Sequence, residues 1–349
     1  MVGKSLGECF EESFSSRKEK RAITFLRDGK VESEITYQRL DHDACRMAET
    51  LKALGVEKGD RVILLFQKSL IFVVVHLAIQ KLGAVSVPLN PGFKKSELEY
   101  LLQDAEAGLI LIEPEREALI GEIAPDLPCL MVDTRKPYHE LDLFHGTAKD
   151  LIPPEITPDD PGLIIYTSGT TGRPKGAVLT QRNLIHDARN IIKVWEIDAR
   201  DVICHALPLF HVHGLCFALH TPLLAGAHLL LLDQFSKLIE YMGDRRPDFE
   251  HMRLWTSGSA PLPAKEFERI HRIFGKEPVE REGMSETGMN FSNPLRGKKK
   301  PGSIGLPLPG LDVRIVDPAT GTDVRPGQTG EIWLKGPAIS PGYWRKPDE

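Results

Sequence analysis

Cysteine is scarce in this sequence of 349 residues: five are scattered along the chain, and no two have C-x-x-C spacing. An odd, dispersed set argues against a disulfide framework or a zinc site and favours reduced thiols in the cytoplasm. Excess charge is also small, because the formal net charge is −5. We therefore expect no nucleic-acid partner and no electrostatic attraction to an anionic membrane.

Long hydrophobic runs are missing as well. The most apolar segment, Leu70–Ile79, is bounded by Lys68 and Lys81, well short of the roughly 20 residues that a transmembrane helix needs. It predicts a buried helix in which His76 is a core residue with satisfied hydrogen bonds rather than a ligand. The N-terminus has no long apolar region and is typical of neither a secretory signal nor a transit peptide. We expect a cytoplasmic protein without a membrane span.

Helix-like and strand-like segments alternate in the first part of the chain. Apolar residues recur at helical spacing over 36–54 and 69–82, and Ser96–Glu99 is typical of a capping box before a further helix. Alternation with strands is typical of parallel pairing and a doubly wound α/β lobe. The strand-like runs lie at 61–66, 85–89 and 108–112.

A chain of this length is too long for one compact core. The Pro-rich run 153–161 predicts a connector between a first α/β lobe, residues 1–160, and a second lobe of the same kind, residues 161–300. From residue 301 to 349 the composition changes to frequent Pro and Gly. Short strands predicted at 312–316 and 331–334 indicate the start of a small β subdomain.

The run Tyr166–Thr180, YTSGTTGRPKGAVLT, carries the most chemistry. It lies between the strand-like segment Leu163–Tyr166 and a helix that Asn183 can cap. Its backbone N–H groups, hydroxyls and lysine suit an anion, and its glycines allow close approach, so we expect polyphosphate to bind. The spacing G-x-x-G-x-x-K from Gly169 to Lys175 differs from the P-loop motif G-x-x-x-x-G-K-[ST].

This run resembles, nearly letter for letter, the phosphate-binding signature of the adenylate-forming superfamily of acyl-CoA synthetases, luciferases and peptide-synthetase adenylation domains. The resemblance is strongest to acyl-CoA synthetases, and malonyl-CoA synthetases look especially similar. It implies two doubly wound α/β lobes followed by a partial small β subdomain, without the C-terminal lid domain. Further segments match in the same order: LPLFHVHG at 207–214, TSGSAPLP at 256–263, EGMSET at 282–287, and the runs 302–316 and 330–344.

The resemblance also implies site residues. Thr167 and Glu286 would hold Mg²⁺, and with Lys175 and His211 they would form the catalytic set. His211 would lie near the acyl adenylate, with helix capping by His211 and His213 as the alternative. Glu282 replaces an aromatic residue that usually lies against adenine, and its carboxylate would accept from the adenine amino group. The residues implied in binding ATP or AMP are Thr167, Ser168, Gly169, Thr170, Thr171, Gly172, Lys175, Gly258, Ser259, Ala260, Glu282, Gly283, Met284 and Ser285.

The implied activity is an AMP- and pyrophosphate-forming ligation of a carboxylic acid to coenzyme A. The acid attacks the α-phosphate of Mg·ATP, and coenzyme A then attacks the acyl adenylate. Relatives carry about one more helix and strand between Gln234 and Ser236, and they continue beyond residue 349 into a ribose-binding aspartate and a lid with a catalytic lysine, so we expect impaired catalysis. The alternatives are a nucleotide-binding fragment with little or no turnover and an unrelated ATPase. The acid and the oligomeric state stay open.

Overall fold

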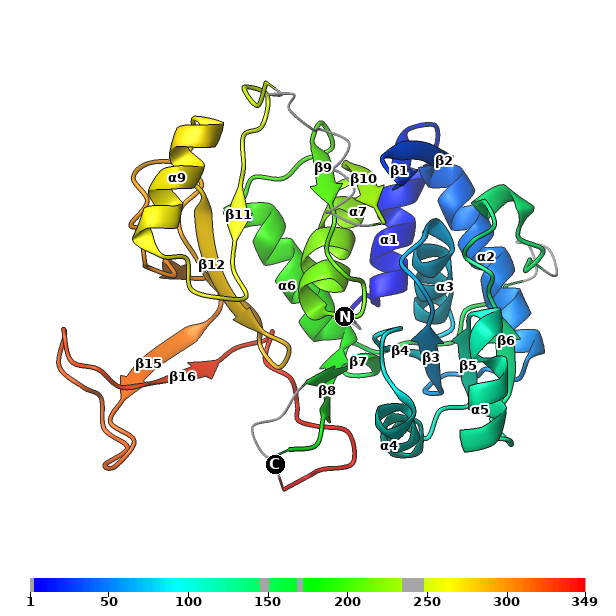
Figure 1. The fold of residues 1–349 in the computed structure, drawn as a ribbon. Coiled ribbons are helices and arrows are strands. Elements are labelled where there is room, and N and C mark those ends of the chain that lie inside the picture. Colours follow the sequence, from blue (N-terminus) through cyan, green and yellow to red (C-terminus); the bar gives the residue numbers. More distant parts are fainter. Residues whose placement is uncertain (1–2, 145–150, 168–171, 234–247, 349) are drawn as a thin grey trace.

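The structure, a computed structural model, describes residues 3–144, 151–167, 172–233 and 248–348 (Figure 1). Apolar residues at helical spacing form its main helices, and short apolar runs form its strands. The helices are α1 (Leu6–Ser15), α2 (Tyr37–Ala53), α3 (Leu70–Lys81), α4 (Lys95–Ala105), α5 (Glu117–Ile123), α6 (Gln181–Val194), α7 (Thr221–Ala225) and α9 (Ala264–Phe274), with 3₁₀ turns η1 (Pro114–Arg116) and η2 (Tyr138–Glu140) and a π-helical segment η3 (His213–His220).

The larger sheet has six strands in the order β6-β5-β3-β4-β7-β8. Neighbouring strands are parallel except β7 and β8, which form an antiparallel hairpin. The strands predicted at 61–66, 85–89 and 108–112 are confirmed to within one residue at each end. The six are β3 (Arg61–Leu65), β4 (Val85–Pro88), β5 (Leu109–Ile112), β6 (Cys129–Met131), β7 (Pro161–Thr167) and β8 (Lys175–Thr180).

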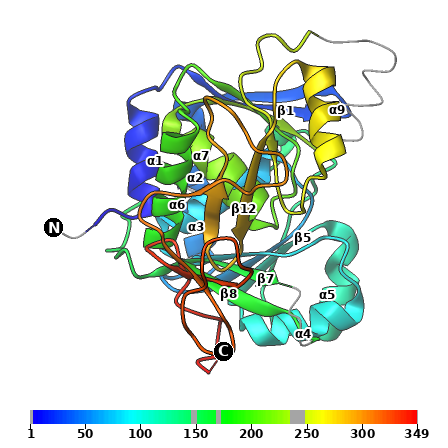
Figure 2. The ribbon, with the colours of Figure 1, turned by 90° about the vertical axis from the view of Figure 1, so that its left-hand side faces the viewer.

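Both faces of this sheet are buried. Successive side chains of each strand point to opposite faces, and those on each face pack in a different core. Ile63 and Leu65 of β3 pack in a core with α4 and α5, whereas Val62 and Leu64 pack in a larger core with α1, α2 and α3. Figure 2 shows α4 and α5 together on one side of the sheet. Burial of each such side chain contributes about 1.5–3 kcal/mol to folding. The predicted α/β fold, with helices on both faces of a mainly parallel sheet, is confirmed.

Helix α3 is buried along its length, as its apolar sequence predicted. His76 within it has two polar neighbours: its Nδ1 lies 2.9 Å from Ser86 Oγ, and its Nε2 lies 2.8 Å from Nε2 of His220. His76 is therefore a core residue with hydrogen-bond partners. Across the described ranges, no helix combines the length and the apolar character needed to cross a membrane.

A second sheet of four strands, in the order β2-β1-β10-β9, joins the start of the chain to its middle. Strand β10 pairs in parallel with both β1 and β9, and its leucines pack in the same large core as the helices. Both large sheets thus combine strands from either side of residue 160, and the division into 1–160, 161–300 and 301–349 stays a prediction. The strands are β1 (Arg21–Arg27), β2 (Lys30–Thr36), β9 (Val202–His205) and β10 (His228–Leu232).

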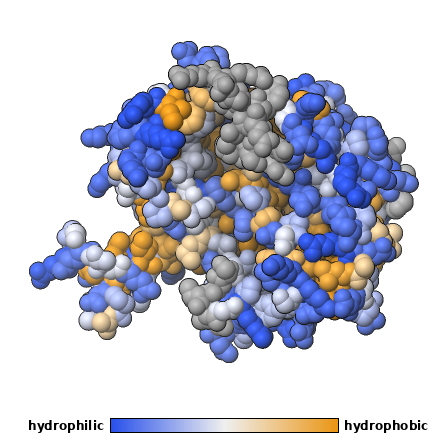
Figure 3. Space-filling model, viewed as in Figure 1, coloured by the Kyte–Doolittle hydropathy of each residue, from blue (hydrophilic) through white to orange (hydrophobic). Residues whose placement is uncertain are grey.

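Two smaller sheets complete the described chain. The sheet β11-β12-β13-β14 lies beside α9, and β15 and β16 form a two-stranded arm that projects from the rest (Figure 1). The arm confirms the strands predicted at 312–316 and 331–334, and it exposes the apolar residues Ile315, Ile332 and Trp333 (Figure 3). The strands are β11 (Thr256–Ser257), β12 (Val279–Met284), β13 (Gly288–Ser292), β14 (Leu306–Pro307), β15 (Asp312–Val316) and β16 (Glu331–Lys335).

Two predicted helix starts are wrong. Ser96–Glu99 is not a capping box, because the cap of α4 lies two residues earlier, at Lys94, whose backbone N–H donates to the Glu97 carboxylate at 2.9 Å. Asn183 is not the cap of α6. The cap is Thr180. Its Oγ1 accepts at 3.3 Å from the backbone N–H of Asn183, which is three residues later, as in a capping box.

Candidate nucleotide and acid site

The predicted phosphate-binding run folds as a β-hairpin and not as a direct link from strand to helix. Strand β7 ends at Thr167, β8 begins at Lys175, and the two residues are paired across the hairpin. The strand β8 forms because residues 177–179 are apolar and buried in the sheet. Gly172 has φ +107°, a conformation that favours glycine. The predicted ligands Ser168, Gly169, Thr170 and Thr171 lie outside the described residues.

A carboxylate lies beside the ends of this hairpin. Glu286 Oε1 accepts a 2.8 Å hydrogen bond from the Tyr343 hydroxyl and lies 3.5 Å from Thr167 Oγ1. The Lys175 ammonium lies 5.4 Å from the centre of the Tyr343 ring. The structure therefore brings together Thr167, Lys175 and Glu286, three of the four residues predicted as catalytic. Tyr343 joins them although sequence reasoning gave its segment a structural role only.

Glu286 is presented by the turn between β12 and β13. An added Cβ at Gly283 would lie 2.4 Å from the Gly288 carbonyl oxygen, so the close pairing of the two strands requires glycine here. On the other side, Asp187 of α6 accepts from the Met289 backbone N–H at 2.8 Å. Burial raises the pKa of Asp187 to about 7. The Asp187–Met289 hydrogen bond connects the turn that carries Glu286, the candidate metal ligand, to α6, the helix that follows the β7–β8 hairpin.

Glu282 already has a partner within the protein. Its Oε2 accepts from Asn290 Nδ2 at 3.0 Å, across the β12–β13 hairpin. Of the other residues predicted to contact nucleotide, Met284 is exposed at the end of β12 and Ser285 follows it in the turn. The role of all three toward adenine stays a prediction.

A second cluster centres on Arg281, which sequence reasoning did not select. Arg281 is only 4% exposed, and its Nη2 donates to the imidazole of His213. Within the part of the chain that the structure describes, its Nε has no hydrogen-bond partner and its guanidinium forms no ion pair. Burial lowers the pKa of Arg281 to about 10, and burial together with Arg281 lowers the pKa of His213 to about 3. His213 is therefore neutral, and Arg281 is a buried cation that forms no ion pair among the described residues, although Glu282 and Asp187 attract it at longer range.

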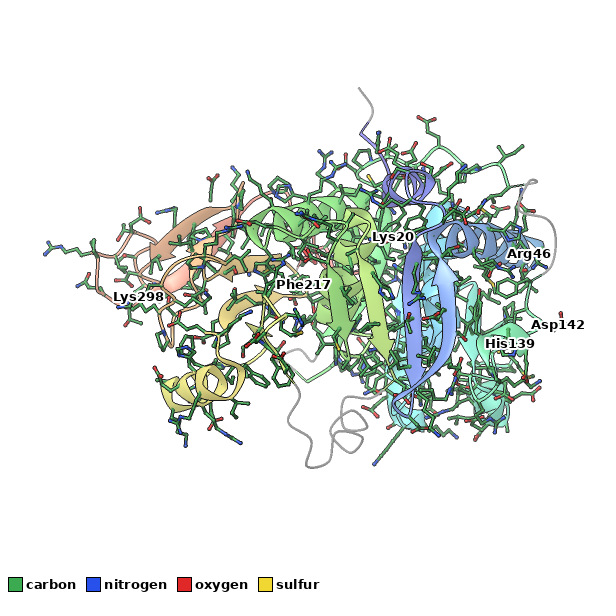
Figure 4. The ribbon with its side chains drawn as sticks, turned by 90° about the horizontal axis from the view of Figure 1, so that it is seen from above. Lys20, Arg46, His139, Asp142, Phe217 and Lys298 are labelled. Atoms are coloured by element: carbon green, nitrogen blue, oxygen red, sulfur yellow. The ribbon has the colours of Figure 1, made fainter. Side chains whose placement is uncertain are left out.

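The segment after β11 packs directly on this arginine. A Cβ added at Gly258 would lie 2.6 Å from Arg281 Cζ, so glycine is needed for the guanidinium to fit. Ser259 follows with φ +72°, and its Oγ lies 3.2 Å from His213 Nδ1. The Phe217 ring of η3, whose centre is 5.3 Å from Arg281 Cζ, closes the cluster (Figure 4). Gly258, Ser259 and the exposed Ala260 thus lie beside the arginine.

His211, the fourth predicted catalytic residue, contacts neither Arg281 nor Glu286 in the described residues, although it lies near enough to His213 to lower the pKa of that imidazole. Its ring is exposed against Phe210, and among the described residues it has no hydrogen-bond partner. The turn that carries it is held by the half-buried Lys68, whose Nζ donates to the carbonyls of His205 and Leu207 at 3.0 and 2.9 Å. The structure therefore places His213, and not His211, against the Arg281 guanidinium.

The order of these segments along the chain can be compared with known proteins. A profile described as AMP-binding enzyme matches residues 10–243 and 239–344, which is nearly the whole chain. The chain belongs to this family. The adenylate-forming, acyl-CoA-synthetase-type resemblance read from the sequence is thereby confirmed.

Individual relatives of this chain are CoA ligases. The mitochondrial malonate–CoA ligase of Bos taurus is 34% identical over 89% of this chain, and this chain spans 62% of that protein's length. The long-chain-fatty-acid–CoA ligase of Bacillus subtilis is 30% identical over 100% of this chain and 72% of the relative. ATP-bound MatB from Rhodopseudomonas palustris has a TM-score of 0.89 and 34% identity over 99% of this chain and 73% of that one.

The family match also bears on the segment predicted to be missing near Phe235. The profile matches in two segments that meet at residues 239–243. The alignment with the Bos taurus ligase is 374 positions long although it covers 89% of the 349 residues here, so that relative has residues without a counterpart in this chain. The place predicted for the missing helix and strand lies outside the described residues.

Proposed function

We propose that this chain supplies the nucleotide and acid site for ATP-dependent activation of a short dicarboxylic acid, such as malonate, which is then transferred to coenzyme A. Membership of the AMP-binding enzyme family and similarity to CoA ligases support acid activation in general. The observation that carries the dicarboxylic acid is Arg281.

A buried, unpaired guanidinium costs several kcal/mol of desolvation, and proteins ordinarily offset this cost with a carboxylate. Among the described residues no carboxylate forms an ion pair with Arg281, and Glu282 and Asp187 attract it only at longer range. His213, Ser259 and Phe217 surround it. The proposed site needs one carboxylate that reacts with ATP and another that pairs with Arg281, and a dicarboxylic acid supplies both. One carboxylate attacks the α-phosphate of ATP, and the other binds the guanidinium.

The phosphate end of the site would be formed by the hairpin. Thr167, Gly172 and Lys175, with the residues of the turn at 168–171, would bind the β- and γ-phosphates. Glu286 and Thr167 offer hard oxygen atoms within 3.5 Å of each other, which suits Mg²⁺ because this ion takes only one or two protein ligands beside phosphate oxygens. Bound there, Mg²⁺ would neutralise charge on the triphosphate.

The test compares malonate with a monocarboxylate of similar size, propionate. In Arg281→Met, malonate affinity in the presence of ATP should fall about 10- to 100-fold, the loss of one charge-assisted pair, whereas propionate affinity should not change. The variant should fold at least as stably as the parent, because a buried charge has been removed. The control is Arg253→Met, whose guanidinium is already paired with Asp201 at 2.6 Å.

Calorimetric binding and acid-dependent pyrophosphate exchange should both be measured. Malonate-dependent exchange that Arg281→Met abolishes would support activation of a dicarboxylic acid. Malonate binding without exchange would support the alternative, a nucleotide-binding fragment with little or no turnover. Equal malonate affinity in parent and Arg281→Met would refute the assignment of Arg281.

A further inference from the structure

The segment that follows the β15–β16 arm returns to the phosphate hairpin. Residues 340–344 run along β8: the Val178 N–H donates to the Gly342 carbonyl at 3.0 Å, and the Trp344 N–H donates to the Gly176 carbonyl at 2.7 Å. Tyr343 forms an antiparallel bridge with Ala177. The segment therefore extends the edge of the six-stranded sheet beside the strand that begins with Lys175. We call residues 336–344 the return strap.

The return strap is also fixed to the carboxylate turn and to α6. The Ser340 N–H donates to the Glu286 carbonyl at 2.7 Å, and its Oγ donates to the Val178 carbonyl at 2.8 Å. Asn183 Nδ2 donates to the carbonyls of Pro337 and Ile339 at 2.8 and 3.0 Å. Because the strap is anchored at its start and along its course, the Tyr343 side chain has little freedom to move relative to Glu286.

We infer that Tyr343 is a positioning residue for both charged groups of the phosphate and metal site. Its hydroxyl orients the Glu286 carboxylate through the 2.8 Å hydrogen bond, and its ring holds the Lys175 ammonium 5.4 Å from its centre. This inference rests on the metal role proposed for Glu286. It assigns separate tasks to the two parts of one side chain, since the hydroxyl acts on the metal ligand and the ring acts on the phosphate-binding lysine.

The separation of tasks gives a direct test by ATP titration, once with EDTA and once with excess Mg²⁺. Tyr343→Phe keeps the ring and removes the hydroxyl. It should weaken the Mg²⁺-dependent part of ATP binding about 10-fold, the effect of losing a group that orients a metal ligand, and leave binding in EDTA unchanged. Tyr343→Leu also removes the ring, and should additionally weaken ATP binding in EDTA about two- to fivefold.

Two further variants keep the test decisive. In Tyr138→Phe a tyrosine loses an equivalent bond, 2.7 Å to Asp43 Oδ2, far along the chain from the phosphate hairpin, and metal dependence should not change. In Glu286→Gln the metal-dependent part of ATP binding should be lost, and adding Tyr343→Phe to it should have no further effect. This double-mutant cycle reports the coupling even if each variant is less stable.

The outcomes distinguish this inference from the proposals on which it depends. If Glu286→Gln leaves metal dependence intact, the metal role of Glu286 fails. If Glu286→Gln abolishes metal dependence but Tyr343→Phe matches the parent, or weakens ATP binding equally with EDTA and Mg²⁺, then Tyr343 is only structural and the inference is overturned. Malonate selectivity, tested through Arg281, is independent of either result.

Discussion

Acidification should destabilise this protein through a pair of histidines in its core. His76 and His220 are both 0% exposed, and their rings stack at 5.0 Å with an interplanar angle of 11°. Their Nε2 atoms lie 2.8 Å apart, so one ring donates its Nε2 proton and the other accepts, and the two rings cannot both be protonated there. Burial lowers the pKa of His76 to about 3 and the pKa of His220 well below its usual range.

The sign follows from where each state takes up protons. Above about pH 6.5 both histidines are neutral whether the chain is folded or unfolded. Below that pH the unfolded chain binds protons that the folded protein cannot bind until about pH 3 in the case of His76. Stability is therefore lost as pH falls, by up to about 1.4 kcal/mol per pH unit for each histidine. At about pH 5.5 the pair costs about 3 kcal/mol, a large share of the 5–15 kcal/mol typical of a domain.

The assay is urea unfolding of His220→Gln and of the parent protein between about pH 7 and pH 5. His220→Gln removes one of the two histidines that bind a proton in the unfolded chain but not in the folded protein. The slope of the unfolding free energy against pH should therefore fall by up to about 1.4 kcal/mol per pH unit. The slope remains informative even if the variant is less stable at neutral pH. His139→Gln, at a side chain 71% exposed, should keep the parent slope. A parent-like slope in His220→Gln would mean that the folded protein protonates this pair, and the reasoning would be wrong.

Two further predictions concern carboxylates. The pKa of Asp187 in the folded protein, about 7, lies above its value in the unfolded chain, so this carboxyl takes up its proton first in the folded state and stabilises the fold as pH falls. Asp187→Asn removes this contribution and should therefore steepen the loss of stability between about pH 7 and 4. The same urea series would show this, and an unchanged slope would contradict it. Glu282→Tyr should tighten AMP binding by about 1–3 kcal/mol if stacking on adenine is what the site lacks. Unchanged AMP affinity by calorimetry would argue that the Glu282–Asn290 pair occupies a position away from the base.

Local patterns predicted most elements that local interactions determine. Helix α3 and the strands β3 and β5 lie where apolar spacing put them, because each buries the side chains that define the pattern. Strand β8 was missed, since the glycine-rich run before it was read as leading directly into a helix. Its strand character depends on pairing with β7 and on burial in the sheet, neither of which is visible in the run itself.

Sequence reasoning missed Tyr343 and Arg281 for different reasons. Tyr343 lies 57 residues from Glu286 in the chain, and only the return strap brings them together. Arg281 stands directly before the matching segment EGMSET at 282–287 and lies outside it. A signal was nevertheless present: the charged run Glu280–Glu282 continues from Val279 into a glycine-containing strand, and the first two charges are buried in the structure. Successive charges in a short strand between apolar neighbours are a reason to look for buried ion chemistry.

Strand β12 sets the distance between the two residues proposed to bind the acid and the metal ion, Arg281 and Glu286. Arg281 lies within β12 and Glu286 lies five residues later in the turn, so at about 3.3 Å per residue their backbones are at most roughly 16 Å apart. In the proposed function the substrate carboxylate binds at the first position and Mg·ATP at the second, and the α-phosphate must lie between them. A one-residue slip would turn Arg281 to the opposite face of the strand while leaving the turn in place. The bulge between Glu282 and Gly283, and the close approach of Gly283 to Gly288, therefore fix the register that sets the spacing of Arg281 and Glu286 in the proposed site.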